Sequence, residues 1–145
     1  MLIAAAFAAS AARADGYLPE LQASAREQRL AEERGWIRLV HYERGVFGGW
    51  HSEASSSFFL SPRGADDPAG ELDATLAAFF SAEGQCRFPA RMAWLNSRLH
   101  FDFARLPLGS CPKFEEFFGK IAARSITLVF SSYFLSSPAS AFGHT

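Results

Sequence analysis

Residues 85–91 read Gln-Cys-Arg-Phe-Pro-Ala-Arg, and they hold a cysteine, two arginines and a proline that each predict a feature of the fold. Pro89 suits the first turn of a helix, where its missing N–H leaves no hydrogen bond unmade. The apolar side chains of Trp94, Leu95 and Leu99 continue the pattern beyond it. The stretch therefore predicts a helix that opens at Pro89 and runs to about Leu99.

The chain has two cysteines, Cys86 and Cys111. An even count in an exported chain favours a disulfide, which would contribute roughly 3 kcal/mol by closing the loop between them. Two free buried thiols are the alternative, and Cys86 beside Arg87 is a further candidate as a nucleophile. Two cysteines without a paired histidine motif are too few ligands for a metal, so no metal site is expected.

Arg87 and Arg91 are four residues apart and would share one face of a continuous helix. Such a pair can clamp a carboxylate or phosphate ligand. More often such a pair holds an internal ion pair with a residue such as Glu71 or Asp73. The sequence leaves both interpretations open.

The N-terminus has the pattern of a secretory leader. Residues 1–14 combine a short apolar run with a small-x-small cleavage site at Ala12-Arg13-Ala14, which makes Asp15 the expected mature N-terminus. No basic residue precedes the apolar run, so the usual basic n-region is missing and the start codon is open to question. An alanine-rich first helix is the alternative. Export to the periplasm or cell envelope is the expectation.

Hydrophobic periodicity predicts an α+β fold in which helices precede a core strand. A first helix is expected over 17–33, within an N-terminal unit at 15–35, and ends before Gly35. A second helix is expected over 71–80. A third is expected from Pro112 onward, with a wide phenylalanine face. Strands are expected over 36–42 and 125–135. Residues 58–60 read as a short strand or a core plug, and glycines at 45, 48 and 49 and the turn chemistry of 61–70 read as loops.

Composition and missing motifs exclude several classes of function. The net charge is -1 and no basic run exists, so no nucleic-acid partner is expected. No apolar run reaches 18 residues, so no transmembrane span is expected. The phosphate-binding, nucleophile-elbow, zinc-protease and dinucleotide motifs are absent, and no cofactor is implied.

His144 is the histidine with the strongest case for chemistry. It follows the predicted core strand and a proline turn, and Gly143 before it permits close approach of a substrate. A neutral imidazole there could take a proton from a thiol or hydroxyl group. His41, on the predicted strand 36–42, is expected to be structural, and His51 and His100 receive no role.

Several blocks together resemble the Lnb N-terminal periplasmic domain family of Gram-negative bacteria, over about residues 36–145. The most specific blocks are Cys-Arg-Phe-Pro-Ala-Arg at 86–91 and Phe-Gly-His-Thr at 142–145. Weaker ones are Leu39-x-His41-Tyr42, Phe58-Phe59-Leu60-Ser61 with Gly64, Pro68 with Glu71-Leu72, Trp94-Leu95, Cys111, Phe130-Ser131-Ser132-Tyr133 and Pro138-Ala139-Ser140-Ala141.

The resemblance implies a permuted papain-like, NlpC-type domain in which the histidine precedes the nucleophilic cysteine. It implies lipoprotein N-acylation: a thiolate accepts a fatty acyl group from a phospholipid and passes it to the N-terminal amine of a lipoprotein. His144 alone maps onto this chemistry, as the general base. Cys86 lies before the histidine in a different motif, so the nucleophile role is not transferred to it.

The chain departs from the family at Ser137, where asparagine is usual, at Ala141, where methionine is usual, and in length. The family continues beyond Phe-Gly-His-Thr, so the chain is expected to be an inactive N-terminal fragment. Two alternatives remain open. One is an envelope peptidase or amidase of the same fold. The other is a non-catalytic binding module that uses the arginine pair and the phenylalanine-rich surface.

Overall fold

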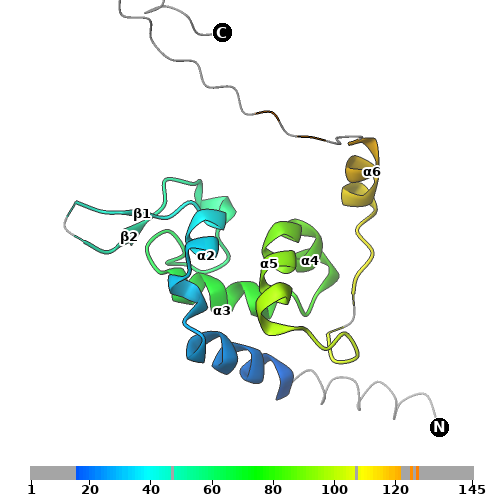
Figure 1. Cartoon of the computed structure of the whole chain (residues 1–145), viewed down its shortest axis with the longest axis horizontal. Coiled ribbons are helices and arrows are strands. Elements are labelled where there is room, and N and C mark those ends of the chain that lie inside the picture. The colour runs from blue at the N-terminus through cyan, green and yellow to red at the C-terminus, as the bar shows by residue number, and fades with distance from the viewer. Residues whose placement is uncertain (1–15, 47, 107, 122–124, 126, 128–145) are drawn as a thin grey trace, which may run out of the picture.

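The structure of the protein is a computed structural model that describes residues 16–46, 48–106, 108–121, 125 and 127. These residues form a mainly helical unit with one small antiparallel sheet, which agrees with the predicted α+β class at a coarse level (Figure 1). The predicted leader at 1–14 and His144 lie outside the described residues. So does the predicted strand 125–135, apart from two positions.

The N-terminal helix spans residues 16–27 and buries Tyr17, Leu21 and Ala25, one side chain per turn. It ends at residue 27, before the predicted end at residue 33, and Arg29 follows in a left-handed conformation with φ 53°. The 3-10 helix η1 (Leu30–Glu32) follows and places Leu30 in the core with no exposed surface.

The strand predicted over 36–42 is wrong, because this segment forms helix α2 (Arg34–Leu39). Trp36 and Ile37 of this helix and Val40, which caps it, are buried, and they have helical spacing rather than the alternation of a strand. Gly35 does not stop a helix but lies in the first turn of α2, where a Cβ would collide with the indole of Trp94. His41 ends this region with φ 58°.

A short hairpin follows, made of β1 (Glu43–Arg44) and β2 (Trp50–His51). The strands are antiparallel, with Glu43 opposite His51 and Arg44 opposite Trp50. Gly48 and Gly49 have φ of 86° and 80°, the left-handed region that glycine adopts without strain, so the predicted loop is the turn of this hairpin.

Residues 52–67 are irregular and contain one 3-10 turn, η2 (Ser56–Phe58). The segment 58–60 forms no strand. Its three apolar side chains are half-buried and pack against the core, as the core-plug alternative expected. The amide of Ser52 donates to the carbonyl of Ala65 across 2.8 Å, which ties the hairpin to the end of this loop.

Three helices then form the remainder of the compact unit: α3 (Pro68–Ala78), α4 (Ala82–Arg87) and α5 (Pro89–Leu99). Asp67 caps α3 by accepting from the amide of Gly70 at 3.0 Å, and Ser81 caps α4 in the same way. The predicted helices over 71–80 and from Pro89 are confirmed. The sequence analysis did not predict α4.

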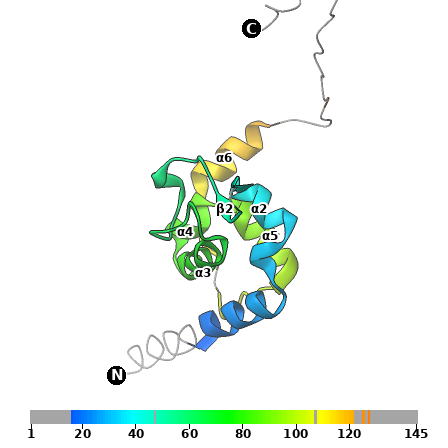
Figure 2. The ribbon, with the colours of Figure 1, turned by 90° about the vertical axis from the view of Figure 1, so that its left-hand side faces the viewer.

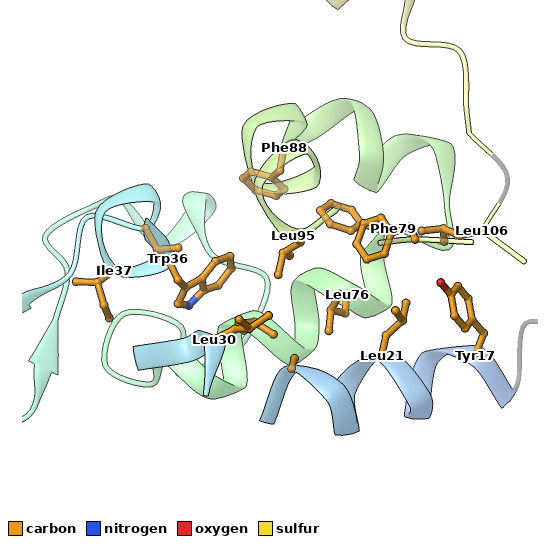
Figure 3. Packing of buried hydrophobic residues seen from close by; sticks show 14 of the residues in the cluster. Tyr17, Leu21, Leu30, Trp36, Ile37, Leu76, Phe79, Phe88, Leu95 and Leu106 are labelled. Atoms are coloured by element: carbon orange, nitrogen blue, oxygen red, sulfur yellow. The ribbon is translucent and has the colours of Figure 1, made fainter. Parts of the chain in front are cut away.

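The core lies between the N-terminal helix, η1, α2, α3 and α5 (Figures 1 and 2). Figure 3 shows Tyr17 and Leu21 rising from the N-terminal helix toward Phe79, Leu76 and Leu106. The fully buried apolar side chains are Leu30, Trp36, Val40, Leu76, Phe79, Leu95 and Leu106. No helix among the described residues is long and apolar enough to cross a bilayer.

Helix α6 (Pro112–Lys120) begins at Pro112 as predicted, but it stands at the edge of the molecule after an extended stretch (Figure 1). Its phenylalanine face is exposed, although phenylalanine at helical spacing usually packs into a core. Phe117 and Phe118 are 63% and 64% exposed, and no residue of α6 belongs to the described core cluster.

Candidate functional site

The predicted disulfide is confirmed. Cys86 in the last turn of α4 is bonded to Cys111, the residue that caps α6, with the two Cα atoms 5.3 Å apart. A cysteine held in this bond has no thiolate to offer, so the reading of Cys86 as a nucleophile fails for the bridged protein. The bond instead fixes the start of α6 to the helical unit.

A buried glutamine strengthens the same junction. The side-chain amide nitrogen of Gln85 donates to the carbonyl of Phe79 across 2.7 Å, and its oxygen accepts from the amide of Gly109 across 2.7 Å. Gln85 is 5% exposed, so both bonds are shielded from water. The covalent bond and the amide bonds together hold residues 109–111 against α4.

Arg91 and Glu71 form an ion pair that is closed to solvent, with side chains 3% and 0% exposed. Nη1 of Arg91 donates to Oε1 of Glu71 across 2.6 Å and to Oγ1 of Thr75 across 3.1 Å. Nη2 donates to the carbonyl of Phe58 across 3.2 Å. The structure thus pairs Arg91 with one of the two carboxylates that the sequence suggested.

The carboxylate of Glu71 also accepts hydrogen bonds from the backbone. The amides of Leu60 and Ser61 donate to its carboxylate across 3.0 Å and 2.8 Å. Burial lowers the pKa of Arg91, while the hydrogen bond and charge of Glu71 act in the opposite direction. The ion pair therefore fastens α5 and α3 to the loop at 58–61.

Aromatic rings enclose the guanidinium. Its central carbon lies 4.0 Å from the ring centroid of Phe88, 4.6 Å from that of Phe58 and 5.7 Å from that of Trp36. Nη1 and Nη2 are bonded inside the protein and rings lie over the guanidinium, while Nε is buried without a hydrogen-bond partner. Because the side chain is only 3% exposed, Arg91 presents no surface to a dissolved carboxylate or phosphate. Its role in this structure is to organise the core.

Arg87 does not share a helix face with Arg91, because α4 ends at Arg87 and Phe88 breaks the helix with φ -130° and ψ 60°. Its guanidinium donates to the carbonyl of Ser57 and lies 5.0 Å from the ring of Phe88. The side chain is exposed. The two arginines donate to the adjacent carbonyls of Ser57 and Phe58, one from the surface and one from the core, and do not form a joint clamp.

Two hollows of the described surface lie beside the hairpin. One, of about 580 Å³, is lined by residues of the 51–65 segment, and a neighbouring one of about 540 Å³ by residues of the hairpin. His51, Glu53 and Ala54 line both. These hollows could admit a polar ligand of small-molecule size.

His51 carries the most pronounced polar geometry in these hollows. Its Nδ1 lies 2.7 Å from Oδ1 of Asp66, and both side chains are more than half exposed. The carboxylate favours the tautomer with a proton on Nδ1, which leaves Nε2 as an acceptor. The sequence analysis missed this pair because the two residues are fifteen apart and lie beside the bond between the amide of Ser52 and the carbonyl of Ala65.

Of the other histidines, His41 does not lie on a strand but follows α2, with its ring centroid 5.7 Å from that of Phe58. His100 caps α5 in a left-handed conformation. Among the described residues no group of three or more histidine, cysteine, aspartate and glutamate side chains is arranged to hold a metal. The predicted catalytic residue, His144, lies outside the described residues.

Residues 28–98 match the family model of a domain of unknown function, DUF7843. The match runs from just before η1 to the end of α5, so it contains the Arg91–Glu71 pair and both hollows but neither Cys111 nor α6. No curated protein and no solved structure shows significant similarity to the chain.

Proposed function

We propose that the chain is the N-terminal part of an exported thiol acyltransferase with a papain-like, NlpC-type fold. In this proposal the helical unit supports the catalytic part, and His144 is the general base. The single observation that carries the proposal is the Cys86–Cys111 disulfide. Such bonds persist in oxidising compartments, and this one joins the helical unit to the segment that leads toward His144.

The proposed chemistry transfers an acyl group in two balanced steps. The imidazole of His144 takes the proton of a thiol, and the thiolate attacks an ester carbonyl of a phospholipid. A thioester forms and the lysophospholipid alcohol leaves with the proton. The N-terminal amine of a lipoprotein then attacks the thioester, which gives an amide and restores the thiol.

The thiol must come from outside residues 1–145. The chain has two cysteines, and they are bonded to each other. The proposal therefore assigns to this chain a base and a scaffold, and assigns the nucleophile to polypeptide encoded after Thr145. An in-frame cysteine codon in that region is the first thing to look for.

The decisive experiment replaces His144 in the protein as its gene encodes it. We expect His144→Ala to abolish N-acylation of lipoproteins in cells with no other source of that activity, measured by mass spectrometry of lipoprotein N-termini. His100→Asn is the matched control, because asparagine tolerates the left-handed conformation at that position. Full N-acylation with His144→Ala would refute the proposal.

A peptidase or amidase of the same fold would use the same base but pass the acyl group to water. Incubation of the purified protein with labelled phospholipid and a lipoprotein acceptor separates the two, since a transferase gives labelled lipoprotein and a peptidase or amidase does not. Both activities should disappear with His144→Ala.

A second candidate, a non-catalytic binding module, is favoured by the hollows around His51. The contact surface first considered for such a module included Arg91, which is 2% exposed and unavailable. The contact surface of such a module would instead consist of the hollows and the exposed face of α6. A binding module keeps its function in His144→Ala and loses it when the hollow is altered by Asp66→Ala.

A further inference from the structure

Helix α6 carries an apolar face with no partner among the described residues. The side chains of Phe114, Phe117, Phe118 and Ile121 recur at intervals of three and four residues, which places them on one side of the helix. They are 38%, 63%, 64% and 46% exposed. The rings of Phe114 and Phe118 contact one another with centroids 5.5 Å apart. The face is therefore a cluster of apolar side chains turned toward solvent.

Lysine side chains border this face. Lys113 lies four residues before Phe117 and Lys120 lies three residues after it, so both stand beside that ring on the helix surface. Both lysines are exposed. Lys120 pairs with Glu116 across 2.6 Å, whereas Lys113 has no carboxylate partner in the part of the chain that the structure describes. An apolar sector edged by lysines is typical of a helix that lies in a membrane interface.

We propose that the apolar face of α6 is a contact site for the surface of a phospholipid bilayer. The aromatic and isoleucine side chains enter the boundary between headgroups and acyl chains, and the ammonium group of Lys113 meets lipid phosphate. The nine residues of α6 extend about 13.5 Å, less than half of a hydrocarbon core that is about 30 Å thick. The helix therefore lies in the plane of the interface and does not cross it.

The position of α6 leaves this face accessible. The helix stands at the edge of the molecule, beyond α4 and α5 and after an extended stretch (Figure 1). The bond between Cys86 and Cys111, and the hydrogen bond from the amide of Gly109 to Gln85, anchor the residues before it. Contact through α6 would thus hold the helical unit beside the bilayer. This inference goes beyond acyl transfer, although the phospholipid of the proposed reaction would lie in the same membrane.

A second copy of the chain is a poorer occupant. The four exposed side chains offer on the order of 400 Å² of apolar surface, judged from the full area of such side chains. A stable protein interface buries about 800 Å² on each partner. A bilayer sets no such minimum, because the strength of interfacial binding grows with the apolar area that leaves water. The small area and the lysine border together favour lipid.

The first test uses a photo-activated cross-linker in the whole chain, mixed with vesicles of phosphatidylethanolamine and phosphatidylglycerol. With benzoylphenylalanine in place of Phe117, we expect illumination to add the mass of one phospholipid at position 117. Benzoylphenylalanine in place of Glu116, on the polar side, is the matched control and should give no lipid adduct. Adducts of position 117 with a second chain, or with another segment of the same chain, and none with lipid would overturn the proposal.

Flotation with the same vesicles measures the strength of the contact. Phe117→Asp with Phe118→Asp should lower the partition coefficient on the order of tenfold or more, because two rings no longer leave water. Val46→Asp is the matched control, since Val46 is 97% exposed but belongs to the hairpin, and it should bind like the unaltered chain. Equal binding by the double variant and the unaltered chain would overturn the inference. His144→Ala should bind normally, so failure of membrane contact and failure of acyl transfer are distinguishable.

Discussion

Arg91 of α5 and Glu71 of α3 are joined across 2.6 Å at a point that solvent does not reach. Around this contact converge two helices, the loop at 58–61 and three aromatic rings. A buried pair of this kind adds little stability compared with apolar residues of the same shape, but losing one partner is costly because the other charge stays buried.

Arg91→Met is therefore expected to lower the free energy of unfolding by about 3–5 kcal/mol. Arg98→Met is the matched control on the same helix. Arg98 pairs with Glu33 across 3.1 Å at the surface, and exposed pairs contribute about 0–1 kcal/mol. Urea unfolding followed by circular dichroism measures both variants. Equal losses for the two would contradict the buried role of Arg91.

Tyr42 should make stability fall in alkaline solution. Burial, and secondarily the charge of Glu71, raise the pKa of Tyr42, and its hydroxyl donates to the carbonyl of Gly64. Below about pH 10 the phenol is neutral in both states. Above that pH the unfolded chain releases the proton and the folded chain does not, so the free energy of unfolding falls by about 1.4 kcal/mol per pH unit.

Tyr42→Phe removes this alkaline dependence and costs about 1 kcal/mol at neutral pH through the lost hydrogen bond. Urea titrations between about pH 8 and pH 11 on the protein and the variant provide the comparison. The same steep decline in both proteins would show that another group is responsible.

Three glycines form a graded test of packing. An added Cβ at Gly84 would collide with the backbone carbonyl of Ala78, and one at Gly35 would collide with the indole of Trp94. We expect each alanine variant to lose about 1–3 kcal/mol. Gly119→Ala in α6 meets nothing within 4 Å and should be neutral or stabilising by about 0.5–1 kcal/mol. Differential scanning calorimetry ranks the three, and a destabilised Gly119→Ala would be inconsistent with the open surface there.

Breaking the disulfide should release α6 without unfolding the helical unit. Reduction should add the mass of two hydrogens, and Cys86→Ser with Cys111→Ser should raise amide exchange over 109–120 far more than over 28–98. The upper limit for the loss in stability is roughly 3 kcal/mol for a loop of this length. An unchanged mass on reduction would show that the bond is absent from the protein.

Local signals predicted the starts of α5 and α6, because Pro89 and Pro112 act through their own backbone neighbours. The cap at Asp67 was not recognised, so α3 begins three residues earlier than predicted. The failure at 36–42 has a tertiary cause. Trp36 donates its indole N–H to the carbonyl of Pro68 across 2.9 Å, and this contact across 32 residues favours a helix where a short alternating pattern favoured a strand.

The candidate site was predictable in part. The pairing of Cys86 with Cys111 followed from the cysteine count, and Glu71 was among the partners considered for Arg91. The separation of Arg87 from Arg91 was not predicted, because Arg87 belongs to α4, a helix that the sequence analysis did not predict and that ends before Phe88. The contact between His51 and Asp66 depends on the hairpin and left no sequence signal.

The positions of the two cysteines also bear on the order in which the nascent chain folds and forms its disulfide. Both members of the ion pair and the rings around it come from residues 36–91, so they have all been synthesised before Cys111. Cys111 lies 25 positions after Cys86, and synthesis of those residues takes about 1–5 s at ordinary rates of translation. The core contacts of the helical unit can therefore form while Cys86 is still a thiol, and the disulfide forms after them.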